Sequence, residues 1–189
     1  MSDLNSVTLM GQVSSSIQVF SNETRKVMKF SVQTVEIWYK DEVQREKVEN
    51  HSIVIYNNKV IDNIEARLTE NSCVYIEGKM KYEKTENDKK SFIVVDIIDG
   101  DLKIITVDKK DHVNKISLIG RVGADPEFSN TNDNKRIAKF SFATSEKWKD
   151  RITGELKEKT DWHKIVCYNS KIVQNIENYV KKGKFLHMW

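Results

Sequence analysis

The chain has 189 residues, a length that allows one or two domains. Its hydrophobic share of 39% is modest, but β-branched and aromatic residues are frequent, so we expect a folded chain rather than a disordered one. A single proline and seven glycines exclude collagen-like and proline-rich linker classes. No apolar run approaches the length of a membrane span, and the polar first residues do not resemble a signal peptide.

Positive charge is concentrated in the second part of the chain. Residues 1–105 carry 14 Lys and Arg against 17 Asp and Glu, a net charge of −3, whereas residues 114–189 carry 15 against 9, a net charge of +6. A polyanion should therefore prefer the second part. Cys73 and Cys167 lie inside apolar runs without disulfide or metal spacing, which favours small buried side chains in a reducing, intracellular compartment.

The first 105 residues predict three strands, a short helix and two further strands. Apolar runs predict strands at 5–13, 26–36, 51–57, 73–82 and 91–98. Val60, Ile61, Ile64 and Leu68 have helical spacing, which places the helix after the third strand. A charged connector is expected at 39–48 and a polar hairpin loop at 83–90. This element order is typical of the five-stranded OB barrel.

The sequence then repeats itself at an offset of roughly 110 residues, which indicates two domains of one fold rather than a solenoid. The matching runs are Asn5–Gly11 with Asn114–Gly120, Lys29–Thr34 with Lys139–Thr144, and His51–Asn57 with His163–Asn169. The second copy predicts strands at 114–122 and 135–146, a charged connector at 149–160 with a turn at Thr153-Gly154, a third strand, and a helix around Ile172–Val180.

We therefore predict an all-β chain with one short helix per repeat, made of two tandem OB-fold barrels with five-stranded Greek-key topology. The domains are residues 1–105 and 114–189, joined by a linker at 106–113. The second copy reaches only the beginning of its fourth strand at Gly183–Trp189, so we expect it to lack its last strands. Three readings stay open: another chain completes this barrel, the half is poorly stable, or the sequence is truncated.

The run Trp162–Tyr168 carries the first indication of function. With a strand's period of two, one face holds Trp162, Lys164, Val166 and Tyr168, and the other holds His163, Ile165 and Cys167. Nucleobases stack on aromatic rings, and nearby ammonium groups attract phosphates. Ordinary strand packing is the alternative, because strands favour Trp and Tyr. His51 and His163 are expected to be structural, and no metal-ligand spacing or nucleophile motif occurs, which argues against a cofactor and against an enzyme.

Several runs of the second copy resemble the bacterial single-stranded DNA-binding protein (SSB) family. They are Asn114–Glu127, Phe142–Trp148, Thr153–Glu155, Thr160–Val166 and Tyr179–Gly183. The first copy matches more loosely, best at Val74–Lys79. Two copies in tandem resemble the two-OB members of the family, which pair as dimers that supply four barrels. The family's acidic, partner-recruiting tail has no counterpart in this sequence.

The resemblance implies a set of stacking residues. Trp148 and Trp162 stand where the family has two stacking tryptophans, and Tyr168 stands where it has a stacking phenylalanine. The candidates in the first copy are Trp38, Tyr56 and Tyr82. Because Asn50 and Ser52 replace Trp162 and Lys164 there, the first copy should be the weaker binder. We expect the rings and ammonium groups, Trp148 and Trp162 included, to share the outer side of the sheet.

The implied function is sequence-independent binding of single-stranded DNA in replication, recombination and repair, without chemistry. The candidate phosphate-binding residues are Arg121, Arg136, Lys139, Lys147, Lys149, Lys164 and Lys171, each of which is otherwise an ordinary solvated charge. The expected partners are single-stranded DNA and further copies of the chain, but no membrane, in the cytoplasm at the nucleoid. The alternatives are an OB module that prefers RNA and a non-binding interaction or remnant protein.

Overall fold

A computed structural model describes residues 3–84, 89–95, 102–104, 112–150 and 153–189, with backbone alone between residues 83 and 104. The chain divides into two compact units. The N-terminal unit comprises residues 6–116, and the C-terminal unit comprises residues 117–189 together with the first few residues. Within the described ranges, no helix is long and apolar enough to cross a membrane.

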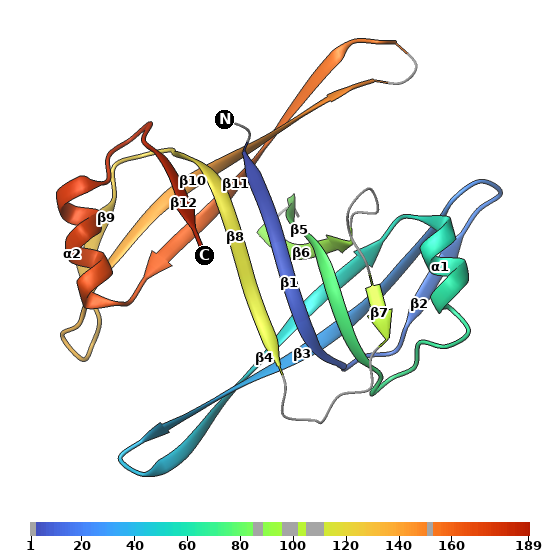
Figure 1. The fold of residues 1–189 in the computed structure, drawn as a ribbon, viewed down its shortest axis with the longest axis horizontal. Helices are drawn as coiled ribbons and strands as arrows, with labels where there is room; N and C mark the ends of the chain where they lie inside the picture. The colour runs from blue at the N-terminus through green and yellow to red at the C-terminus, as the bar shows by residue number, and fades with distance from the viewer. Residues whose placement is uncertain (1–2, 85–88, 96–101, 105–111, 151–152) are drawn as a thin grey trace. The chain divides into compact units, whose positions relative to one another are not determined.

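The N-terminal unit is built on a sheet that closes on itself (Figure 1). Its elements are β1 (Leu4–Val13), β2 (Gln18–Ser21), β3 (Lys26–Lys40), β4 (Val43–Ile55), α1 (Asn58–Ile64), β5 (Cys73–Lys84), β6 (Lys89–Val95) and β7 (Leu102–Ile104). Strand β1 pairs antiparallel with both β3 and β5, and β3 continues to β4. Strand β5 pairs antiparallel with β6. Strand β6 in turn pairs parallel with β4, and this pairing completes the ring. This closure leaves no free edge among these five strands.

Every second side chain along the strands points to the inside of this ring and fills it. In β3, Met28, Phe30 and Val32 are buried, whereas the residues between them are not. The same alternation buries Leu9 in β1 and Ile76 in β5. The apolar side chains of helix α1, among them Ile61 and Ile64, pack against the same core. Burial on one face of each strand therefore fixes the register, and with it the direction of every outward side chain.

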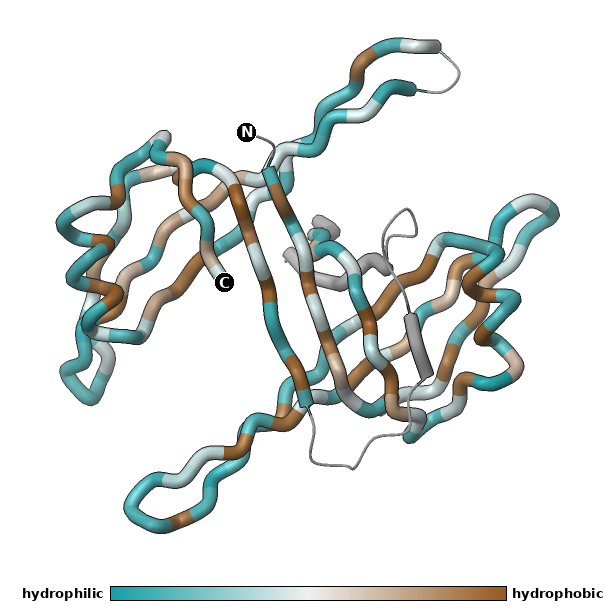
Figure 2. The backbone as a smooth tube through the Cα atoms, viewed as in Figure 1, coloured by the Kyte–Doolittle hydropathy of each residue, from teal (hydrophilic) through white to brown (hydrophobic). Residues whose placement is uncertain are grey.

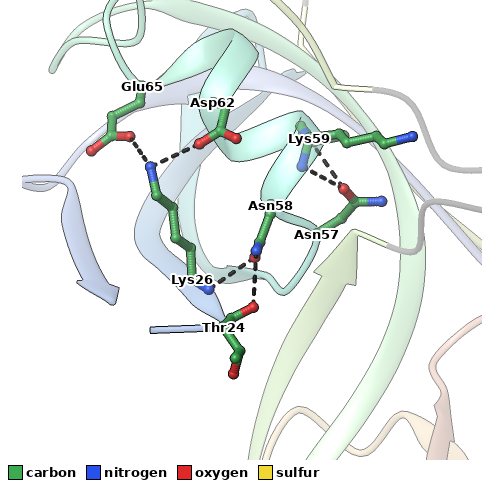
Figure 3. A network of polar contacts seen from close by, with 8 residues as sticks. Thr24, Lys26, Asn57, Asn58, Lys59, Asp62 and Glu65 are labelled. Carbon is green, nitrogen blue, oxygen red and sulfur yellow. Dashed lines mark hydrogen bonds and ion pairs between the residues drawn. The ribbon is translucent and has the colours of Figure 1, made fainter. Parts of the chain in front are cut away.

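Helix α1 is held at its start by two neighbouring asparagines (Figure 3). The Asn57 side chain caps the helix by accepting from the backbone N–H of Lys59 at 2.7 Å. Asn58 accepts from the backbone N–H of Lys26 at 2.9 Å, and the Lys26 Nζ donates to Asp62 at 2.7 Å and Glu65 at 3.1 Å. The hydrogen bond to Asp62, followed by that to Glu65, raises the pKa of Lys26. Strand β3 and α1 are thus tied at the surface as well as through the core.

The C-terminal unit repeats this plan with an open sheet. Its elements are β8 (Val113–Val122), β9 (Glu127–Asn130), β10 (Arg136–Lys149), β11 (Leu156–Cys167), α2 (Ser170–Tyr179) and β12 (Phe185–Met188). Strand β10 lies between β11 and β8, and β12 pairs with β8. Among the described residues of this unit no strand joins β11 to β12, so the ring stays open there. The prediction of β structure with one short helix per repeat is confirmed.

The predicted charged connectors are wrong, because their residues continue the flanking strands. Strands β3 and β4 are separated only by Asp41 and Glu42, with φ angles of 53° and 61°, which are typical of a two-residue hairpin turn. Strand β10 extends to Lys149, and strand β11 begins at Leu156. The predicted turn is present at Gly154, which has a φ of 72°. Paired backbone groups satisfy each other, so an exposed ribbon needs no apolar alternation. Figure 2 shows the ends of both hairpins as largely hydrophilic.

Three short strands were not predicted: β7, which pairs with β5, and the two strands β2 and β9. Strands β2 and β9 lie in the segments expected to be loops, where they pair with the beginnings of β3 and β10. The predicted strand at 91–98 appears as β6, and residues 96–98 lie outside the described ranges. The middle of the predicted loop at 83–90 and most of the predicted linker at 106–113 also lie outside them.

Candidate nucleic-acid interface

One side of β10 and β11 is turned to solvent. The inward positions pair Phe142 with His163, which are 0% and 2% exposed. The positions between them pair Ala143 with Trp162, and Trp162 is 48% exposed. We call this solvent side the outer face; on these two strands it includes Lys139, Ser141, Ala143, Trp162, Lys164 and Val166. Strand alternation alone therefore presents a large ring and two ammonium groups on one surface.

The ring of Trp162 lies over the end of β8. A Cβ atom on Gly123 would stand 2.3 Å from Cζ3 of Trp162 and 2.6 Å from Oγ of Ser141. The backbone N–H of Gly123 donates to the carbonyl of Ser141 at 2.8 Å. One edge of the indole is therefore supported by bare backbone, while almost half of the side chain stays open to solvent. Such a surface suits an unpaired base, which stacks without sequence preference.

Trp148 occupies the β10–β11 hairpin beyond the core and is 42% exposed. It pairs with Lys157 and is in phase with Phe142, so alternation places it on the other side of the ladder from Trp162. The Trp148 pair lies five positions further along the ladder than the Trp162 pair, roughly 17 Å along the ribbon. The expectation that both share the outer side is therefore wrong, although neither is buried. Charged side chains hide the strand period in this segment, whereas its backbone continues the ladder without a break and so keeps the strand phase.

Tyr168 follows the last residue of β11 and is 68% exposed. It immediately precedes Asn169, whose side chain caps helix α2 by accepting from the backbone N–H of Lys171 at 3.1 Å. The cap fixes the chain at the exit from the strand. An exposed ring thus stands at a defined position next to the end of the outer face.

The N-terminal unit exposes corresponding rings. Trp38 is 40% exposed and Tyr56 is 54% exposed. Trp38 pairs with Arg45 and is in phase with the buried Val32, so it lies on the same side of its hairpin as Trp148 does on its own.

Tyr82 is half-buried and follows the inward phase of Ile76 on β5. The structure therefore gives Tyr82 a different setting from the other five aromatic candidates.

Three of the seven candidate cations already contact protein groups. Arg136 pairs with Glu177 at 2.5 Å and lies over the Phe128 ring. Arg121 lies on the outer face opposite Ala143, donates to the carbonyl of Gly183 at 3.3 Å and covers the Phe185 ring. Lys147 lies 3.5 Å from Glu158. Arg136 thus has a structural role, tying β10 to α2.

The other four cations have no ion pair within the described part of the chain; they are Lys139, Lys149, Lys164 and Lys171. Lys139 and Lys164 lie diagonally across the β10–β11 ladder on the outer face. Lys149 lies at the end of the hairpin, and Lys171 lies in the first turn of α2. The structure brings Lys139 and Lys164 together with Trp162, and leaves Lys149 and Lys171 at the periphery.

The two strand histidines face inward and bond to threonines. Thr34 Oγ1 lies 2.9 Å from Nε2 of His51, and Thr144 Oγ1 lies 2.9 Å from Nε2 of His163. Burial lowers the pKa of His51. Over the described residues, no three His, Cys, Asp or Glu side chains gather as a metal site would require.

Comparison with known sequences identifies relatives of one kind. A model of the single-strand binding protein family matches residues 4–105 and 113–188. Single-stranded DNA-binding proteins of Rhizobium meliloti and Rickettsia felis are 51% and 49% identical to this chain over 76 residues. That stretch is 40% of this chain and 44% and 50% of the two relatives. The aligned region thus spans about half the length of the curated relatives.

Solved structures show the same fold. The wild-type single-stranded DNA-binding protein of Thermus aquaticus has a TM-score of 0.75 at 13% identity, covering 99% of this chain and 84% of that one. The Plasmodium falciparum SSB, solved with ssDNA, has a TM-score of 0.51 at 27% identity, covering 55% of this chain and 96% of that one. The fold of the chain is therefore that of tandem OB domains, as predicted. With both repeats matched by the family model, the chain belongs to the single-strand binding protein family.

Proposed function

We propose that the chain binds single-stranded DNA without sequence preference. The observation that carries this is the outer face of the C-terminal unit, where the half-exposed Trp162 ring shares one surface with Lys164, two residues further along β11, and with Lys139 on β10. Stacking on the ring and phosphate contacts to the ammonium groups together bind any base sequence. The net charge of +6 on residues 114–189 favours a polyanion at this unit. The names of the relatives support the same ligand.

The proposed contacts fall into two classes. The stacking residues are Trp148, Trp162, Tyr168, Trp38, Tyr56 and Tyr82. The phosphate-binding residues are Arg121, Arg136, Lys139, Lys147, Lys149, Lys164 and Lys171. Trp162, Lys139 and Lys164 form the centre of the interface, because the sheet holds them on one surface. Trp148 lies on the opposite side of the β10–β11 ladder from Trp162. A single strand of DNA that contacts both tryptophans therefore passes around the β10–β11 hairpin.

Titration of the whole chain with oligo-dT at two salt concentrations tests the proposal. We expect quenching of tryptophan fluorescence and a binding constant that falls as salt rises, because neutralised phosphates release counterions. A duplex of equal length is the control and should bind more weakly, since its bases are already stacked. Absence of quenching at low salt would sink the proposal. Stronger binding of oligo-U than of oligo-dT would instead favour an RNA-binding module.

The proposal extends to assembly and cellular role. Two copies of the chain would bring four OB domains together, and we propose a homo-oligomer that protects single strands in replication, recombination and repair at the nucleoid. Binding, rather than a chemical reaction, is the proposed activity. Light scattering coupled to size-exclusion chromatography measures the assembly, and a monomer at micromolar concentration would contradict it.

A further inference from the structure

One position on the outer face differs between the two units. In the C-terminal unit Trp162 pairs across the ladder with Ala143, and in the N-terminal unit Asn50 pairs with Gln33. Ala143 and Gln33 follow the buried Phe142 and Val32 by one residue. Asn50 therefore occupies the position of Trp162, on the solvent side of its own sheet.

The residue that faces this position differs as well. The backbone N–H of Gly123 donates to the carbonyl of Ser141 at 2.8 Å, and the backbone N–H of Ser14 donates to the carbonyl of Ser31 at 2.9 Å. Because the same backbone bond is made at the end of the first strand in each unit, Ser14 is the counterpart of Gly123. The pair is thus Gly with Trp in one unit and Ser with Asn in the other.

Space, rather than backbone conformation, requires the glycine. Gly154 and Gly183 are the glycines with positive φ in the described residues, and Gly123 is not among them. A Cβ atom on Gly123 would nevertheless stand 2.3 Å from Cζ3 of Trp162, closer than non-bonded atoms approach. A side chain at position 123 therefore displaces the ring.

In the N-terminal unit the same space is filled by polar atoms. Oγ of Ser14 donates to Oδ1 of Asn50 at 3.2 Å. The Ser14 side chain occupies the space where an indole edge would need bare backbone. Asn50 accepts the hydrogen bond of the Ser14 hydroxyl and offers no ring for stacking. Ser52, at the position of Lys164, also leaves this surface without the neighbouring ammonium group.

We propose that these two positions form a coupled site that decides whether a unit offers a base a stacking ring on its outer face. Gly123 with Trp162 forms the platform, and Ser14 with Asn50 removes it. Neither substitution suffices alone, because a ring without the glycine collides and a glycine without the ring offers nothing to stack on. This inference rests on the proposed function, which it refines by assigning the difference between the units to one residue pair.

The first experiment installs the platform in the N-terminal unit of the whole chain. In a Trp162→Ala background, Ser14→Gly, Asn50→Trp and the double variant are titrated with fluorescently labelled oligo-dT. The double variant should gain roughly five- to 150-fold in affinity, the range expected for one stacked base. The gain should exceed the product of the two single-variant effects. Equal gains for Asn50→Trp alone and the double variant would overturn the coupling, as would no gain in the double variant.

The second experiment removes the platform from the C-terminal unit. Gly123→Ala should lower affinity, whereas Gly123→Ala in the Trp162→Ala background should cause no further loss. Without DNA, Gly123→Ala should also move the Trp162 indole N–H resonance in spectra of 15N-labelled protein; assignment uses Trp162→Phe. The position of the Trp162 resonance is measured without DNA, so it tests the coupling independently of the proposed function.

If the wild-type chain fails to bind oligo-dT, the proposed function fails. An unmoved Trp162 resonance in Gly123→Ala overturns the coupling, whether or not the wild-type chain binds oligo-dT. Should the N-terminal double variant fail to fold, this arm decides alone.

Discussion

At the scale of single residues, Trp162 is the side chain on which the binding surface depends. Its ring is supported by Gly123 on one edge and is 48% exposed. Trp162→Ala should weaken binding of oligo-dT by about 1–3 kcal/mol, through the loss of one stacked base. The measurement is the affinity at low salt. Tyr179→Ala is the control, since Tyr179 is 65% exposed and lies on helix α2 rather than on the sheet, and it should leave affinity unchanged. Equal losses for both variants would contradict the assignment.

His51 gives a residue-scale prediction about stability. Burial lowers its pKa in the folded chain, so the unfolded chain binds this proton more readily. The stabilisation from neutral His51 is present above the ordinary histidine pKa of about 6.5 and is lost as pH falls below it. The urea midpoint of the N-terminal unit should therefore drop from pH 7 to pH 5. His51→Gln, which can still bond to Thr34, should flatten this dependence. Parallel pH profiles for the two proteins would contradict it.

At the scale of elements, the β10–β11 ladder sets which charges act together. Lys139 and Lys164 share the outer face with Trp162 and have no ion pair among the described side chains. Each substitution by Gln should reduce the slope of log affinity against log salt by about 0.7, the value for one phosphate contact to a single strand. Lys59→Gln on α1 of the other unit is the matched control and should leave the slope unchanged. Slopes equal to wild type in the first two variants would exclude these lysines as phosphate contacts.

The hairpins show why an element can be predicted in kind but not in length. The apolar run of β10 identified the strand up to Ser145 and Glu146, but charged residues then hid its continuation to Lys149. Backbone pairing with β11 carries the strand on, regardless of side-chain polarity. That continuation also reversed the expected relation between Trp148 and Trp162, because strand phase is kept along an unbroken ladder.

At the scale of the whole molecule, the two units present one ring in common and differ at another. Trp38 and Trp148 occupy corresponding hairpin positions and are 40% and 42% exposed. The surrounding charge differs, with −3 on residues 1–105 against +6 on residues 114–189. Trp148→Ala should therefore cost more affinity for oligo-dT than Trp38→Ala, since phosphates favour the positive unit. Titration of both variants at one low salt concentration compares them, and a larger loss for Trp38→Ala would contradict this order.

The sequence alone determined the repeated fold and the residue types of the interface. Strand alternation assigned Trp162 and Lys164 to one face and His163 to the interior, because burial on one side of a strand fixes the phase of all its residues. The internal repeat likewise predicted two OB domains, since each copy carries the same order of strands and helix. These inferences needed only local periodicity.

Tertiary structure decided what depends on contacts between distant segments. The ring closure of the N-terminal unit depends on parallel pairing of β4 with β6, and no local pattern specifies that pairing. No local pattern indicates that Gly123 lies beneath Trp162, or that Ser14 bonds to Asn50, because these residues are far apart in the chain and meet only when the end of β8 packs beside β11, and the end of β1 beside β4. Local periodicity sets the phase of each strand, whereas the packing between strands sets the space that each side chain can occupy.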